Sequence, residues 1–299
     1  MRLKYIMLIE SKLKKYRTIH TNKLTSRVLD GSYVSVHKGR SMNFSELREY
    51  VAGDDIRDID FKASARNTSK KLLVKQYIAD KKHNVMLCMD TNKRMLADTR
   101  DGEEKREVAL VSAGALAYLV SKNGDYVSAT YGTQNSIKHY PFKSGNINIE
   151  TILEGYYKEV TMDNDSTIIK DIEYILQNFR RKMIILIVTD IEGIRQMDER
   201  LLKQLKANND VLMIVIEDAN AVGENVYSVA NERYLPDFIT SDKKLEKLQI
   251  KKKKQIYKEC DMKLKKCKIP YSLINNSNEI DIKIIELLNK NKNEKRSFI

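Results

Sequence analysis

The chain has 299 residues, 42% of them hydrophobic, which is enough for one large core and a smaller appendage. Its three cysteines are too few for a disulfide framework, and no apolar run approaches the roughly 20 residues of a transmembrane helix. These features favour a cytoplasmic protein with reduced thiols and argue against a disulfide-stapled or membrane-spanning one. The net charge of +13 is concentrated at the ends, because residues 1–40 carry +8 and residues 243–268 carry +9.

The first eighty residues are predicted to form a basic helix followed by a small hairpin with short helices. Apolar residues recur at helical spacing between basic residues from Leu3 to Leu29, and Asp60 is placed to cap a short helix. We expect helices at 3–29, 43–51 and 61–66, and paired strands at 32–37 and 70–78. The domain organisation that follows is a basic helix over 1–30, a hairpin segment over 31–80 and a larger domain over 81–299.

From residue 84 onwards, strands that are apolar throughout alternate with helices. Such strands must be covered on both faces, and their alternation with helices predicts parallel pairing through right-handed crossovers. The sequence therefore predicts an α/β doubly wound, mostly parallel sheet with helices on both faces. The expected strands are 84–89, 125–132, 182–190, 210–217 and 269–275, and the expected helices are 104–124, 147–158, 166–179, 198–208, 242–267 and 279–292.

Two of these strands end in an aspartate, at Asp90 and Asp190. Ligands of open α/β sheets bind beyond the carboxyl ends of the strands, so both side chains lie where a ligand site would form. A single aspartate at a strand end is more commonly the cap of the helix or turn that follows. For the pair, helix capping and a shared site both remain open.

The residues after Asp90 restrict the chemistry of such a site. A haloacid-dehalogenase type phosphotransferase needs an acid where this chain has Asn92, and the glycine-rich runs of dinucleotide or phosphate loops are absent. The remaining option is the Mg²⁺ site of von Willebrand A-like domains, which follows the pattern D-x-S-x-S. Here Asn92 and Arg94 replace the two serines, and a guanidinium only donates hydrogen bonds. We therefore expect a degenerate metal site, with Arg94 or Lys93 in place of a metal; if a metal binds, it is Mg²⁺ at Asp90 and Asp190.

The segment "YVAGDDIRDIDFKASAR" (50–66), followed by "LLVKQYIADKKHNVMLCMDTNKRM" (72–95), resembles the bacterial family known as domain of unknown function 58. The family pattern is G-D-D-x-R-x-I-D-W-x-x-S-A-R, then L-x-V-K-x-Y, then a von Willebrand A-like strand ending in D-x-S-x-S-M. This chain departs from it at Phe61, Asn92 and Arg94. The resemblance implies a von Willebrand A-like fold and an adaptor or co-chaperone that works with a MoxR-type AAA+ ATPase on a client protein.

The signature run is dense in charge, and its role has two interpretations. The charged residues either form ion pairs that fix the turn and dock the hairpin, or form a surface that meets a partner. Exposed ion pairs contribute only about 0–1 kcal/mol each to stability, so ion pairs in a solvated run would do little to hold the hairpin in place. The candidate partner-binding residues are Asp54, Asp55, Arg57, Asp60 and Arg66.

We expect a non-enzymatic protein-binding adaptor in which Asp90, Asn92 and Asp190 mark the rim that faces a partner. An alternative is a basic nucleic-acid-binding protein that uses residues 1–40 and 243–268. It ranks lower because Tyr257 is the one aromatic residue available for stacking in the lysine-rich segment. A metal-dependent hydrolase built on Asp90 and Asp190 ranks lowest, because the sequence shows no general base nearby.

Overall fold

The structure is a computed structural model that describes residues 3–13, 42–69, 71–79, 82–219, 227–229, 232–234 and 243–296. The chain forms two compact units. The first, the sheet unit, comprises residues 1–29 and 83–299; the second, the signature unit, comprises residues 30–82.

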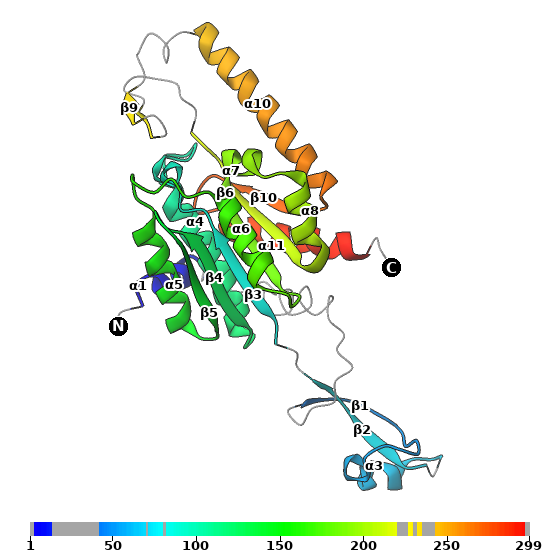
Figure 1. Cartoon of the computed structure of the whole chain (residues 1–299). Coiled ribbons are helices and arrows are strands. Elements are labelled where there is room, and N and C mark those ends of the chain that lie inside the picture. The colour runs from blue at the N-terminus through cyan, green and yellow to red at the C-terminus, as the bar shows by residue number, and fades with distance from the viewer. Residues whose placement is uncertain are drawn as a thin grey trace. The chain divides into compact units, whose positions relative to one another are not determined.

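The sheet unit contains a six-stranded sheet in the order β10-β7-β6-β3-β4-β5 (Figure 1). All neighbours pair in parallel except β5, which is antiparallel to β4 at one edge. Numbered along the chain, this is the doubly wound order 3-2-1-4-5-6, in which the order reverses between β3 and β6. The strands are β3 (Asn84–Met89), β4 (Tyr126–Gly132), β5 (Ile137–Lys143), β6 (Ile184–Asp190), β7 (Asp210–Ile216) and β10 (Tyr271–Ile274).

Helices cover both faces of the sheet, as the apolar strands require. Along β3, Val85, Leu87 and Met89 join one buried cluster, whereas Met86 and Cys88 join the other. The expected α/β, doubly wound, mostly parallel sheet with helices on both faces is therefore confirmed. The first face carries α1 (Lys4–Leu13), α4 (Lys105–Lys122), α5 (Asn146–Glu159) and α11 (Ile280–Arg296); the second carries α6 (Ile168–Asn178), α7 (Ile191–Gln196), α8 (Glu199–Asn208) and α10 (Lys243–Lys266).

The N-terminal helix belongs to the sheet unit. Ile6 and Ile9 of α1 are buried against α4 and α5. The carboxylate of Glu150 on α5 accepts hydrogen bonds from the backbone N–H groups of Tyr5 and Ile6, at 3.0 and 2.9 Å. The free amides at the start of α1 are thus capped by another helix. The sequence-based expectation set residues 1–30 apart as a basic helix and did not predict that α1 packs against α4 and α5.

The signature unit is a two-stranded antiparallel ribbon with short helices inserted between its strands. β1 (Met42–Glu49) pairs with β2 (Leu73–Ala79), and the insertion holds a 3-10 turn, η2 (Ile56–Asp58), and α3 (Phe61–Arg66). The predicted cap is confirmed, because Asp60 Oδ1 accepts from the N–H of Ala63 at 3.0 Å. In the described part of this unit the buried apolar residues are Ile59 and Val74.

Several elements differ from the sequence-based expectation. Residues 43–51, expected as a helix, mostly belong to β1, because pairing with β2 outweighs a weak local helical pattern. The strand expected at 32–37 and the helix beyond Leu13 lie outside the described residues. The elements not predicted are β5, α7, the 3-10 turn η3 (Lys93–Leu96) and a two-residue ribbon of β8 (Tyr227–Ser228) and β9 (Arg233–Tyr234). None of the helices in the described part combines the length and apolar character of a bilayer span.

Candidate functional site

The carboxyl ends of β3 and β6 meet at the point where the strand order reverses. Asp90 directly follows β3, and Asp190 is the last residue of β6. Because the two strands are hydrogen-bonded neighbours, these two aspartates lie side by side. The backbone N–H of Asp90 donates to the carbonyl oxygen of Val188 at 2.9 Å. Both carboxyl side chains are only 1% exposed, so each needs an internal partner.

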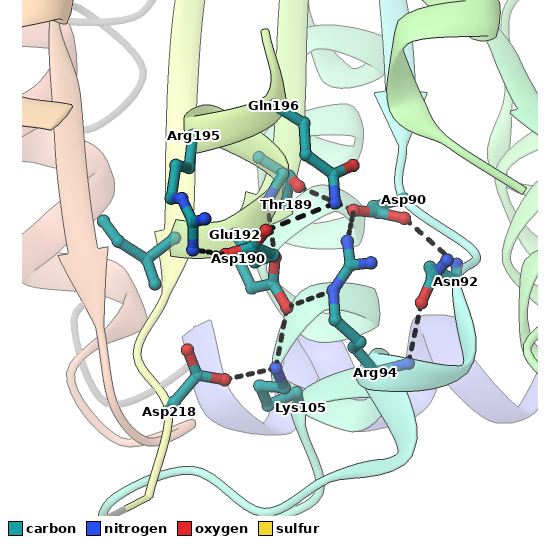
Figure 2. Close-up of polar contacts among 12 residues, drawn as sticks. Asp90, Asn92, Arg94, Lys105, Thr189, Asp190, Glu192, Arg195, Gln196 and Asp218 are labelled. Atoms are coloured by element: carbon teal, nitrogen blue, oxygen red, sulfur yellow. Dashed lines mark hydrogen bonds and ion pairs between the residues drawn. The ribbon is translucent and has the colours of Figure 1, made fainter. Parts of the chain in front are cut away.

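The guanidinium of Arg94 joins these two carboxylates. Its Nε lies 3.2 Å from Asp190 Oδ2, and its Nη2 lies 3.5 Å from Asp90 Oδ2. Arg94 is positioned by η3, whose first turn is capped by Asn92: the Asn92 side-chain oxygen accepts from the N–H of Arg94 at 3.1 Å. Figure 2 shows the guanidinium directed between the two aspartates.

A second cation, Lys105, completes the cluster. Lys105 begins α4 and is 1% exposed; its Nζ lies 2.9 Å from Asp190 Oδ2 and also pairs with Asp218, which follows β7. We call Asp90, Arg94, Lys105, Asp190 and Asp218 the charge cluster (Figure 2).

Sequence reasoning missed Lys105 and Asp218, although one signal was present. A lysine in the first turn of a helix opposes the helix dipole, which favours acids there. Lys105 at the start of a long apolar helix is therefore an anomaly that calls for a nearby acid.

The two aspartates respond differently to this environment. Burial alone raises the pKa of Asp190, but Lys105 and Arg94 outweigh it and hold that pKa at about 2. Asp190 Oδ1 also accepts from the N–H of Gly193 at 2.8 Å and caps α7, so capping and ion pairing coexist. Burial and the charge of Asp190 raise the pKa of Asp90, although Arg94 and the hydroxyl of Thr189 at 2.7 Å oppose that shift.

These residues do not fit a divalent metal. Cationic nitrogens of Arg94 and Lys105 contact the carboxylate oxygens that a metal would need, and both would repel it. The side-chain oxygen of Asn92 is already used by a backbone N–H, and its nitrogen donates to the carbonyl oxygen of Ser166 at 2.9 Å. In the described ranges, no three His, Cys, Asp or Glu residues are grouped to hold a metal.

The charge cluster is also less accessible than expected. Asp90, Asn92 and Asp190 were expected to mark a rim that faces a partner, but all three are buried. Within the run from Asp90 to Arg94, the side chain of Arg94 is the most exposed, at 18%. A partner would therefore reach these carboxylates only after the ion pairs had opened.

The structure separates the five candidate residues of the signature unit instead of joining them in one network. Asp54 forms an ion pair with Arg48, in which Asp54 Oδ1 lies 2.6 Å from Arg48 Nη2. Asp60 caps α3, and its Oδ2 lies 3.3 Å from Lys75 Nζ. Asp55 and Arg57 form a pair at 3.0 Å, in which the Arg57 side chain is 75% exposed. Arg66 is exposed at the end of α3.

Large apolar residues of the signature unit are exposed as well. Val51, Ile56 and Phe61 are each more than 60% exposed, and Leu72 is 44% exposed. All four lie in the insertion or beside it, at the end of the ribbon where Tyr50 N–H donates to the carbonyl oxygen of Leu72. We call these four residues the exposed apolar set.

A further buried acid lies on α6 without a cation. Asp171 is 1% exposed, and its Oδ1 has no hydrogen-bond partner among the described residues. Burial raises the pKa of Asp171 well above its ordinary value, and the charge of Asp90 adds to this shift. The folded protein therefore favours the neutral form of this side chain.

Comparison with known proteins gives one family. The model of the family described as "Protein of unknown function DUF58" matches residues 46–223. Two proteins described as uncharacterized, from Mycobacterium bovis and Mycobacterium tuberculosis, are each 27% identical over 201 residues. The match covers 65% of this chain, and the chain spans 61% of the length of these relatives.

Solved structures show weaker likeness. The conserved hypothetical protein BatB from Bacteroides thetaiotaomicron is 17% identical with a TM-score of 0.45, covering 71% of this chain and 99% of that one. A von Willebrand factor type A protein from Catenulispora acidiphila is 10% identical with a TM-score of 0.39, covering 74% and 45% of the two chains.

Replacing Lys105 with methionine is expected to destabilise the fold by about 3–5 kcal/mol at neutral pH, because Asp190 loses a buried counter-charge. Urea denaturation measures the loss, and Lys138→Met, which breaks the more exposed pair with Glu159, should cost less than about 1 kcal/mol. The double change Lys105→Met with Asp190→Asn should cost less than the sum of its parts. Strict additivity would show that the two side chains are not coupled.

Asp171→Asn is expected to stabilise the protein at neutral pH. Because the folded pKa of Asp171 lies above its unfolded value, its stabilising contribution is complete below about pH 4 and is lost as the pH rises toward the folded pKa. Urea midpoints measured from acidic to neutral pH should therefore fall more for the native chain than for the variant. Asp163→Asn, at an exposed position, is the control; a variant less stable than the native chain at neutral pH would contradict the prediction.

Proposed function

The chain belongs to the DUF58 family of proteins of unknown function, and from this premise we propose that it is a non-enzymatic adaptor or co-chaperone. It binds other proteins and works with a MoxR-type AAA+ ATPase on a client protein. The partner surface is the signature unit, and the charge cluster is a degenerate metal site that stabilises the sheet unit. The three unpaired, buried cysteines favour the cytoplasm as its location.

The observation that carries this proposal is the exposed apolar set. Among its described residues, this unit buries the apolar side chains of Ile59 and Val74 but exposes those of Val51, Ile56 and Phe61. Several large apolar side chains exposed near one end of a small unit favour a protein–protein contact there. Arg57 lies beside Ile56 in η2, and arginine and aromatic residues dominate the binding energy of interfaces.

The charge cluster supports the non-enzymatic part of the proposal. A general base needs a carboxylate that can take a proton from a substrate. Asp90 and Asp190 are buried, and each already accepts contacts from a cation and from a hydroxyl or backbone N–H. Their oxygens are used to hold β3, β6 and α7 together, so neither of these two carboxylates is free to act as a general base.

Phe61→Ala and Arg57→Ala are expected to weaken binding to the MoxR-type ATPase of the same cell by about thirtyfold or more each, the effect of losing an interface hot spot. Both side chains are exposed, so the melting temperature should change little. The matched controls are Ile147→Ala and Arg195→Ala on the sheet unit, which remove comparably exposed side chains. Titration calorimetry measures the affinity, and equal binding by all four variants would contradict the assigned surface.

The degenerate metal site predicts that Mg²⁺ and Mn²⁺ give no binding heat that depends on Asp90. The reason is that Arg94 and Lys105 already occupy the carboxylate oxygens. Calorimetric titration of the native chain and of Asp90→Asn provides the comparison. Tight binding to the native chain that disappears in the variant would refute this part of the proposal.

A further inference from the structure

The long helix α10 carries an ordered row of lysines on its outer side. Its 24 residues include eleven lysines and three acids, over a length of about 36 Å (Figure 1, orange). Lys247, Lys251, Lys254 and Lys258 follow one another at intervals of four, three and four residues, which places them along one face of the helix. All four are exposed, and we call them the lysine stripe.

Two lysines on the inner side of α10, Lys253 and Lys263, bind backbone carbonyl oxygens of the sheet unit. Nζ of Lys253 donates to the carbonyl oxygen of Asp218 at 2.6 Å. Nζ of Lys263 donates to the carbonyl oxygens of Ile194, Arg195 and Met197, near the end of α7, at 2.8–3.1 Å.

By contrast, no lysine of the stripe forms an ion pair within the described part of the chain. Like charges spaced four apart, as at Lys247 and Lys251, repel each other by a few tenths of a kcal/mol. An anionic surface along this face would relieve that repulsion.

The same face presents apolar side chains. Leu248 lies three residues before Lys251, and Met262 lies four residues after Lys258, so both share the side of the stripe. Each is more than half exposed. A helix with lysines and isolated apolar side chains on one exposed side matches the boundary between anionic headgroups and acyl chains, where the charges meet phosphates and the apolar groups insert.

The residues fit a nucleic acid less well. Stacking on bases needs exposed aromatic rings, but Tyr257, the aromatic residue of α10, is half-buried. The stripe contains lysine and no arginine, so it lacks the planar fork that reads base edges or grips one phosphate with two bonds. Leu248 and Met262 would have no role against a phosphate backbone.

We propose that the outer face of α10 docks on an anionic phospholipid surface, with the lysine stripe over the headgroups and Leu248 and Met262 inserted between them. The docking uses residues distinct from those assigned to the ATPase partner, so either proposal can fail while the other stands.

Co-sedimentation of the full chain with phosphatidylcholine vesicles, with and without phosphatidylglycerol, tests the proposal. We expect binding only to the anionic vesicles, with a steep loss at high salt. Changing the four stripe lysines to glutamine should weaken this binding on the order of a thousandfold. The control removes the same amount of charge from exposed lysines elsewhere on the sheet unit and should change binding less than about threefold. Its four substitutions are Lys122→Gln, Lys143→Gln, Lys158→Gln and Lys170→Gln.

The remaining comparisons separate lipid from other anions. Leu248→Gln with Met262→Gln should weaken vesicle binding about tenfold, because insertion of apolar groups is lost. Duplex DNA, tested in parallel at the same salt, should bind more weakly than the anionic vesicles. Equal losses in the stripe and control variants, unchanged binding by the Leu248 and Met262 variant, or binding to DNA without binding to vesicles would each overturn the proposal.

Discussion

The sheet unit depends on the neutralisation of buried carboxylates at its switch point. A doubly wound sheet brings the ends of β3 and β6 together, and in this chain both places hold an aspartate. Two buried negative charges next to each other would oppose folding unless cations compensate them. Lys105 and Arg94 supply that compensation from α4 and η3, and Lys105 extends it to Asp218 beyond β7. Three strand ends and two helical segments are thus held by one set of charges.

This arrangement has a consequence for where the protein meets other molecules. At the switch point, where many open α/β sheets bind ligands, Asp90 and Asp190 are paired with cations of the chain itself. The side chains that we assign to partners belong instead to the exposed apolar set of the signature unit and to the outer face of α10. The proposed functions therefore use surfaces that lie outside the switch point.

The sequence could predict the sheet because each central strand is apolar on both faces and ends at a turn or an acid. It also located Asp90, Arg94 and Asp190, since a strand end followed by a D-x-N-x-R run is visible without coordinates. It could not pair Lys105 with Asp190, because that contact joins residues 85 positions apart through the topology of the sheet. It also missed β5, whose half-exposed residues and edge position, with Pro141, give little apolar signal.

The docking of α1 has implications for biosynthesis. The sheet unit is discontinuous along the chain, since the signature unit is inserted between α1 and β3. Helix α1 is synthesised before α4 and α5, against which it packs, and Glu150 lies 144 to 145 residues downstream of the amides that it caps. Chains are made from the N-terminus, so Ile6 and Ile9 remain without their native contacts until α4 and α5 have been made and have folded. A nascent chain of this protein therefore carries the apolar side chains of α1 without their native partners from the synthesis of α1 until that of α5.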